Sequence, residues 1–175
     1  MPAEDKPAWR DVPPRVRSEV QRRLGAPVIR ARRAYGGYGP SATFALTLTD
    51  GRRAFLKGTY PLPEDSGVVW SLDREDAVYR RLGRLIAPWA PGYLGSVRAD
   101  GWHVLLLELV GDGSVLPWTR PKVKRAVRSF AAFHASTLGQ PLPRWLSRTQ
   151  HEEFASSWRR LERDPDAIER LCVLA

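Results

Sequence analysis

The chain has 175 residues, a formal net charge of +9 and 43% hydrophobic residues. This composition is typical of a globular protein with a core, so it excludes a wholly disordered chain, and the positive charge favours anionic partners. The single cysteine excludes an intrachain disulfide. The longest apolar run is too short to span a bilayer and the first residues lack an apolar signal core, so we expect a cytoplasmic protein without a membrane partner.

Residues 13–24 place apolar side chains on one helical stripe. Pro13 and Pro14 begin this segment and Gly25 follows it, which predicts an N-terminal helix. The period then changes, which predicts three strands over residues 28–35, 43–49 and 52–58; in the second of them, Phe44, Leu46 and Leu48 alternate with smaller or polar residues. "DG" at residues 50–51 predicts a two-residue hairpin turn between the second and third strands.

A helix is predicted from about residue 70 to residue 85, after a proline-rich loop. Residues 93–110 predict two further strands around the turn at Asp100-Gly101. Helical patterns then cover residues 118–138, 147–162 and 165–174. The sequence therefore predicts an α+β fold, in which a five-stranded antiparallel unit with one inserted helix is followed by helices.

Lysine is rare in this chain, with four among the 28 Lys and Arg residues, and Lys57 lies at the end of the third predicted strand. A lysine can hold a phosphate as a point charge on a flexible stem. The first hairpin turns at Gly36, Gly37, Gly39 and Ser41, where glycines allow close approach of a ligand, although such a hairpin tip is also typical of an ordinary turn. No Gly-Lys-Ser/Thr run ends this loop, which excludes an ATPase loop, and a strand instead of a helix follows it, which excludes a dinucleotide loop, so the pattern favours a protein-kinase glycine loop.

Glu75 lies on the apolar face of the following helix, between Leu72 and Tyr79. A carboxylate that faces a core costs free energy unless it is paired. In protein kinases a glutamate of this helix pairs with the strand lysine, so we predict that Glu75 contacts Lys57. The alternative is that Glu75 lies at the helix edge beside a neighbouring arginine.

The apolar strand that ends near residue 110 occupies the position of the kinase hinge. There the backbone at Glu108 and the amide of Val110 would face adenine, and Leu107 would close the back of its pocket. The alternative for Glu108 is a strand residue that faces solvent.

Together these segments resemble the aminoglycoside phosphotransferase family of kinase-like enzymes. The matching runs, within residues 28–138, are "GGYGPSATFALTLTDGRRAFLKG", "LDREDAVYRRL", "APGYLG", "WHVLLLELVGD" and "AAFHA". The resemblance implies a protein-kinase-like fold with a nucleotide-binding lobe over residues 1–110, then a hinge and the first helices of an incomplete second lobe over residues 111–175. It implies ATP and Mg²⁺ as cofactors and a small-molecule acceptor, with the glycine loop over the phosphates.

The residues that carry the family's chemistry are not found in this sequence. The family has a His-Gly-Asp loop followed by an asparagine and a metal-binding aspartate, whereas this chain has no asparagine and no His-Gly-Asp. "DPD" at residues 164–166 is typical of a helix start. His134 lies on an apolar face with Val123 and Val127, which favours a structural role. We therefore expect no catalytic residue and no metal ligand in this chain, which would be inactive by itself.

Two other functions stay open. One is a non-catalytic kinase-like module that binds a nucleotide or a protein. The other is a basic nucleic-acid-binding domain, which we rank last because Phe44 and Phe55 lie in apolar contexts and not among exposed arginines. An incomplete second lobe would leave Trp145, Phe154 and Trp158 partly exposed, so we also expect self-association through that face.

Overall fold

The computed structural model describes residues 6–34, 41–62, 71–111, 117–141, 143–146 and 163. The chain divides into two compact units, Met1–Ser129 and Phe130–Ala175, and each is treated by itself. The predicted boundary between residues 110 and 111 stays a prediction. The predicted helices at 147–162 and 165–174 lie outside the described residues.

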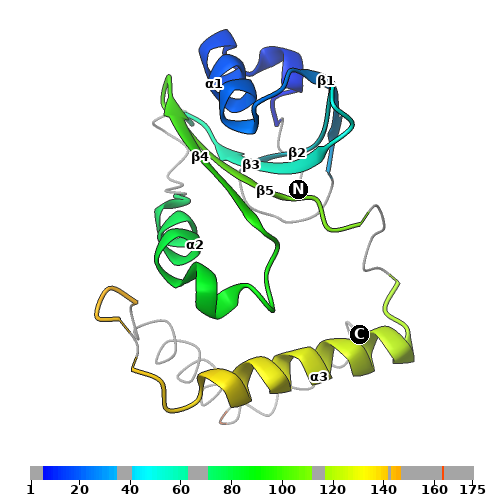
Figure 1. The fold of residues 1–175 in the computed structure, drawn as a ribbon, viewed down its shortest axis with the longest axis vertical. Helices are drawn as coiled ribbons and strands as arrows, with labels where there is room; N and C mark the ends of the chain where they lie inside the picture. The colour runs from blue at the N-terminus through cyan, green and yellow to red at the C-terminus, as the bar shows by residue number, and fades with distance from the viewer. Residues whose placement is uncertain are drawn as a thin grey trace. The chain divides into compact units, whose positions relative to one another are not determined.

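Five strands form one antiparallel sheet with the order β1-β2-β3-β5-β4 (Figure 1). The strands are β1 Val28–Arg33, β2 Ala42–Leu48, β3 Arg53–Thr59, β4 Tyr93–Ala99 and β5 Trp102–Glu108. The helical elements are η1 Trp9–Asp11, α1 Pro14–Leu24, α2 Asp73–Ile86 and α3 Arg120–Thr137. The α+β class and the insertion of one helix between the third and fourth strands are confirmed.

Helix α1 covers one face of the sheet. It begins at Pro14 and ends before Gly25, whose φ of 74° is the left-handed conformation that glycine adopts without strain. Val16, Val20 and Leu24 are buried and pack in one cluster with apolar residues of β2, β3, β4 and β5. Figure 1 shows α2 on the opposite side of the sheet from α1. The apolar core therefore lies between α1 and the sheet, and α2 covers the second face.

The two predicted hairpin turns differ in kind. Asp100 and Gly101 have φ values of 48° and 75°, as a two-residue turn of type I′ requires. In the β2–β3 hairpin only Gly51 has a positive φ, and the Gly51 amide donates to the Leu48 carbonyl at 3.1 Å. The prediction of a two-residue turn at residues 50–51 is therefore wrong. The loop is a three-residue turn with glycine in the left-handed position, because Asp50 keeps a negative φ.

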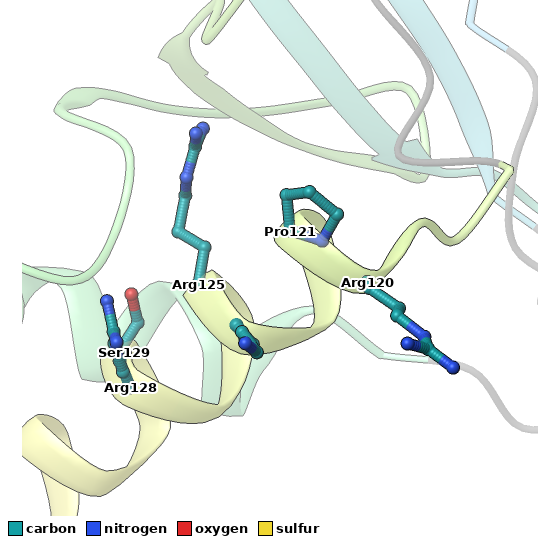
Figure 2. Close-up of a pocket in the computed structure, with 6 residues that line it drawn as sticks. Arg120, Pro121, Arg125, Arg128 and Ser129 are labelled. Atoms are coloured by element: carbon teal, nitrogen blue, oxygen red, sulfur yellow. The ribbon is translucent and has the colours of Figure 1, made fainter.

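Helix α3 carries five cations and leaves its apolar side chains uncovered within the described residues. Val123, Val127 and Phe130 are 44%, 61% and 66% exposed, so the apolar face predicted around His134 is not part of a core here. A depression of about 430 Å³ lies along this helix, and Figure 2 draws the side chains that line it. Its lining residues all belong to α3: Arg120, Pro121, Lys124, Arg125, Arg128 and Ser129. A depression bounded by one helix does not enclose a ligand.

Candidate functional site

β3 presents Lys57 on the face of the sheet that α2 covers. The neighbouring Leu56 is 1% exposed and belongs to the core under α1. Successive side chains of a strand point to opposite faces, so Lys57 points away from that core. Its register partners are Thr43 on β2 and Leu105 on β5. Lys57 thus lies on a central strand of the sheet.

Lys57 contacts Glu75 directly. The Nζ atom donates to Oε2 at 2.5 Å, and the two side chains keep 26% and 34% of their exposure. The predicted contact between these two residues is confirmed. The Glu75 side chain faces the sheet, but it is only half-buried, with a third of it open to solvent. Glu75 lies at the edge of α2, where the cost of burying a charge is small.

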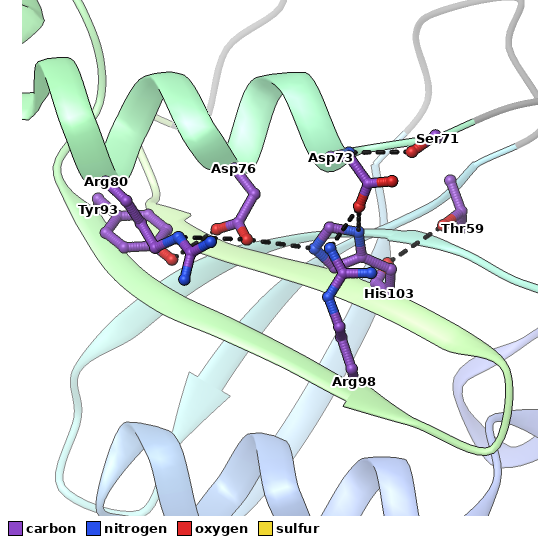
Figure 3. Close-up of polar contacts among 8 residues, drawn as sticks. All are labelled: Thr59, Ser71, Asp73, Asp76, Arg80, Tyr93, Arg98 and His103. Atoms are coloured by element: carbon purple, nitrogen blue, oxygen red, sulfur yellow. Dashed lines mark hydrogen bonds and ion pairs between the residues drawn. The ribbon is translucent and has the colours of Figure 1, made fainter. Parts of the chain in front are cut away.

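The buried carboxylate of α2 belongs to the next residue, Asp76. Asp76 is 2% exposed, and among the residues of α2 it alone is fully buried. Its Oδ1 atom accepts a hydrogen bond from the hydroxyl of Tyr93 on β4 at 2.7 Å. Its Oδ2 atom lies 3.6 Å from Nε of Arg80 and 3.5 Å from Nε2 of His103 (Figure 3). The carboxylate is therefore compensated by the Tyr93 hydroxyl of β4 and by Arg80 of α2 itself, with the His103 ring beside it.

His103 on β5 is 6% exposed and lies between two aspartates of α2. Its Nδ1 atom is 3.4 Å from Asp73 Oδ1, while its Nε2 atom faces Asp76 at an ion-pair distance without hydrogen-bond geometry. Burial and the nearby Arg98 guanidinium lower the pKa of His103, against the opposing effect of the two aspartates. Thr59 on β3 donates its hydroxyl to the His103 carbonyl at 3.4 Å. Because the pKa of His103 is lowered, its neutral imidazole form predominates at neutral pH.

Arg98 on β4 hydrogen-bonds to Asp73, and this bond lowers the pKa of the Asp73 carboxyl. Tyr93, which donates to Asp76, also stacks on Tyr79 of α2 with 5.5 Å between ring centroids and 14° between ring planes. Burial raises the pKa of Tyr93, so its hydroxyl keeps the proton that it donates. The start of α2 is thus joined to β4 by an ion pair, a hydrogen bond and a ring stack.

Sequence reasoning did not find Asp76, Tyr93 or His103. Asp76 occupies the helical position four residues after Leu72, on the same apolar face, and His103 is a polar residue inside an apolar strand. Each is a local signal of a buried polar group that needs a partner. Their pairing could not be read from sequence, since 17 residues separate Asp76 from Tyr93.

The remaining predicted site residues are placed as follows. Ser41 and Leu107 are 7% and 5% exposed, and Val110 is 67% exposed. Glu108 is exposed, as its alternative interpretation proposed, but its Oε2 atom accepts a hydrogen bond from the amide of Gly92 at 3.0 Å. The glycines at positions 36, 37 and 39 lie outside the described residues. The predicted nucleotide contacts of these residues stay predictions.

Two further properties concern the described part of the chain. There, no group of three or more His, Cys, Asp or Glu side chains is arranged to hold a metal ion. In the same residues, no helix has the length and apolar character needed to cross a membrane.

Comparison of the sequence with protein-family models and with curated proteins finds no match. Among solved structures, the chain is similar to a crystal structure of a putative fructosamine-3-kinase from Thermobifida fusca YX-ER1, with 24% sequence identity and a TM-score of 0.45. The similarity covers 69% of this chain and 38% of that one. At this level, the similarity says nothing about the activity or the substrate of this chain.

Proposed function

We propose that this chain is the nucleotide-binding part of an ATP- and Mg²⁺-dependent phosphotransferase for small molecules, of the aminoglycoside phosphotransferase type. The observation that carries the proposal is the 2.5 Å contact between Lys57 on β3 and Glu75 on α2. In protein kinases a lysine on the third strand and a glutamate on the following helix form this pair, and the lysine binds the nucleotide phosphates.

The donor chemistry of Lys57 fits a phosphate. An ammonium group has three N–H donors, and the bond to Glu75 uses one of them, so two stay available for phosphate oxygens. The side chain is 26% exposed, so an anion can approach it from solvent. Ala42 at the start of β2 pairs with Gly58, so the chain that follows the glycine-rich segment enters the sheet beside Lys57. This placement supports phosphate binding by the segment and the lysine together.

Magnesium would arrive with the nucleotide, since it bridges phosphate oxygens in such enzymes. Glu75 would orient the ammonium and neutralise part of its charge when no phosphate is bound. The family's acceptor-activating aspartate and its asparagine have no counterpart among these 175 residues. The role proposed for this chain is therefore binding and orientation of the nucleotide.

Calorimetric titration with ATP and Mg²⁺ tests this proposal on the wild-type chain, Lys57→Arg, Glu75→Ala and the double variant. We expect both single variants to bind about tenfold more weakly, and the double variant to lose less than the sum, because groups in contact are not additive. Lys124→Arg on exposed α3 is the control for the lysine. Glu19→Ala is the control for the glutamate, since its paired side chain has the same 34% exposure as that of Glu75. Equal affinity in all variants contradicts the proposal.

The second candidate function is a non-catalytic kinase-like module, and the lack of any asparagine in the chain favours it. Binding of ATP without hydrolysis or transfer by a protein that carries no further segment supports this function. Tight binding of a protein partner without any nucleotide affinity would support its protein-binding form.

A further inference from the structure

We propose that Asp76, held by the Tyr93 hydroxyl beside His103, is a positioning residue that fixes the register of α2 on the sheet and so keeps Glu75 in contact with Lys57. The importance of this role for nucleotide binding rests on the proposed function. The geometric claim, that Asp76 determines the Lys57–Glu75 contact, stands independently of it.

Three carboxylates within less than two turns of α2 reach three different strands. Asp73 bonds to Arg98 on β4, Glu75 contacts Lys57 on β3, and Asp76 accepts from Tyr93 on β4 and faces His103 on β5. Residues 73 to 76 belong to one rigid helical segment. Fixing Asp76 therefore fixes the direction in which the adjacent Glu75 points.

The Lys57–Glu75 contact tolerates only a small displacement of α2 along its axis. Each helical residue advances about 1.5 Å along the axis and turns by about 100°. A shift of α2 by one residue would carry the Glu75 carboxylate beyond hydrogen-bond reach of Lys57, because the present separation is 2.5 Å. Another contact of α2 must therefore fix a single register of the helix on the sheet.

Apolar packing of α2 cannot fix this register by itself. The fully buried side chain of α2 is a carboxylate, and the apolar residues of the helix are half-buried or exposed, although Leu72 just before its first residue is buried. Partly buried apolar contacts tolerate sliding, whereas a buried charge does not, since each displacement leaves it without compensation. Among the roles of buried polar groups in proteins, fixing a single register is the best attested.

Asp76 and not Asp73 is the determining residue. The Asp73 side chain is 65% exposed, so water can replace its partners, while the Asp76 side chain is 2% exposed. Tyr93 belongs to β4, and its ring stacks on Tyr79 of α2, so the stack and the hydrogen bond to Asp76 join the helix to β4 at two points. His103 lies on the inner strand β5, between Thr59 of β3 and Arg98 of β4. Tyr93 and His103 lie on strands of the sheet, so the contacts of Asp76 with them set the position of the helix on the sheet.

The side-chain ammonium signal of Lys57 in NMR spectra provides the test. Lysine occurs at four positions in the chain, so the signal is assigned by its loss in Lys57→Arg. An ammonium group held by a carboxylate exchanges its protons more slowly with water than a free one. We expect the signal in the wild type and its loss to exchange in Glu75→Ala, Asp76→Asn and Tyr93→Phe, each measured well below its melting temperature.

Asp50→Asn is the matched control, because it removes an aspartate that forms an ion pair with Arg52 at the exposed β2–β3 turn. The Lys57 signal should be unchanged there. If Asp76→Asn does not fold, Tyr93→Phe decides the question, since it removes one hydroxyl and keeps the ring stack. A Lys57 signal that persists in folded Asp76→Asn or in Tyr93→Phe overturns the proposal.

Titration with ATP and Mg²⁺ separates this inference from the proposed function. With both correct, Asp76→Asn binds about tenfold more weakly and Asp50→Asn stays within about twofold of the wild type. If the wild type does not bind ATP, the proposed function fails, and the ammonium signal still decides the role of Asp76. If ATP binds and Asp76→Asn changes neither affinity nor the signal, the positioning role fails and the proposed function survives.

Discussion

The Lys57–Glu75 contact should stabilise the folded chain even when no nucleotide is bound. The perturbation is a double-mutant cycle with Lys57→Met, Glu75→Gln and both changes together. Each substitution removes a charge and keeps most of the side-chain volume, so the cycle isolates the interaction between the two groups.

The expected coupling free energy between Lys57 and Glu75 follows from how exposed their side chains are. Fully exposed ion pairs contribute about 0.2–1 kcal/mol, whereas removing one partner of a fully buried pair costs about 3–5 kcal/mol. The Lys57 and Glu75 side chains retain 26% and 34% of their exposure, so this pair lies between the two limits. We expect a coupling free energy of about 1–2 kcal/mol at low salt. High salt should reduce that energy without abolishing it, since partly buried charges are screened less.

Urea unfolding of the four proteins, followed by circular dichroism at low and high salt, measures the coupling. The control cycle uses Arg22 and Glu19 on α1, where the arginine side chain is 77% exposed and the pair is three residues apart on one helix. Such a pair contributes about 0.2–0.5 kcal/mol and is largely screened by salt. A Lys57–Glu75 coupling no larger than the control value would refute the reasoning from burial. A coupling that high salt removes completely would refute it as well.

Two further predictions concern pH and turnover. Because the folded chain lowers the pKa of His103, stability from its neutral form is present above about pH 6.5 and is lost as the pH falls below that value. Thermal unfolding between about pH 5 and 8 should show this loss in the wild type, and His103→Gln should show a flatter profile. The purified 175-residue chain should transfer no phosphate from labelled ATP to an aminoglycoside, since it lacks the His-Gly-Asp loop and every asparagine. Sustained transfer would contradict the second of these predictions.

Local sequence patterns determined the order of the elements and the position of the lysine. The alternation of apolar residues located β2, short apolar runs located β3 and β5, and the 3.6-residue period located α1 and α2. Lys57 could be singled out because a lysine at a strand end is unusual in an arginine-rich chain. Turn geometry was less accessible, as the β2–β3 loop shows: "DG" specifies a left-handed glycine but not whether the preceding aspartate also adopts a positive φ.

Only the tertiary structure decided which carboxylate of α2 is buried. Glu75 and Asp76 are adjacent and both lie close to the apolar stripe, so periodicity cannot separate them. The strands beneath α2 determine which of the two carboxylates is buried. Lys57 on β3 pairs with the half-buried Glu75, while Tyr93 on β4 and Arg80 of α2 compensate the buried Asp76 beside His103 of β5. Burial of a charge depends on partners from distant parts of the chain, and folding brings those partners together.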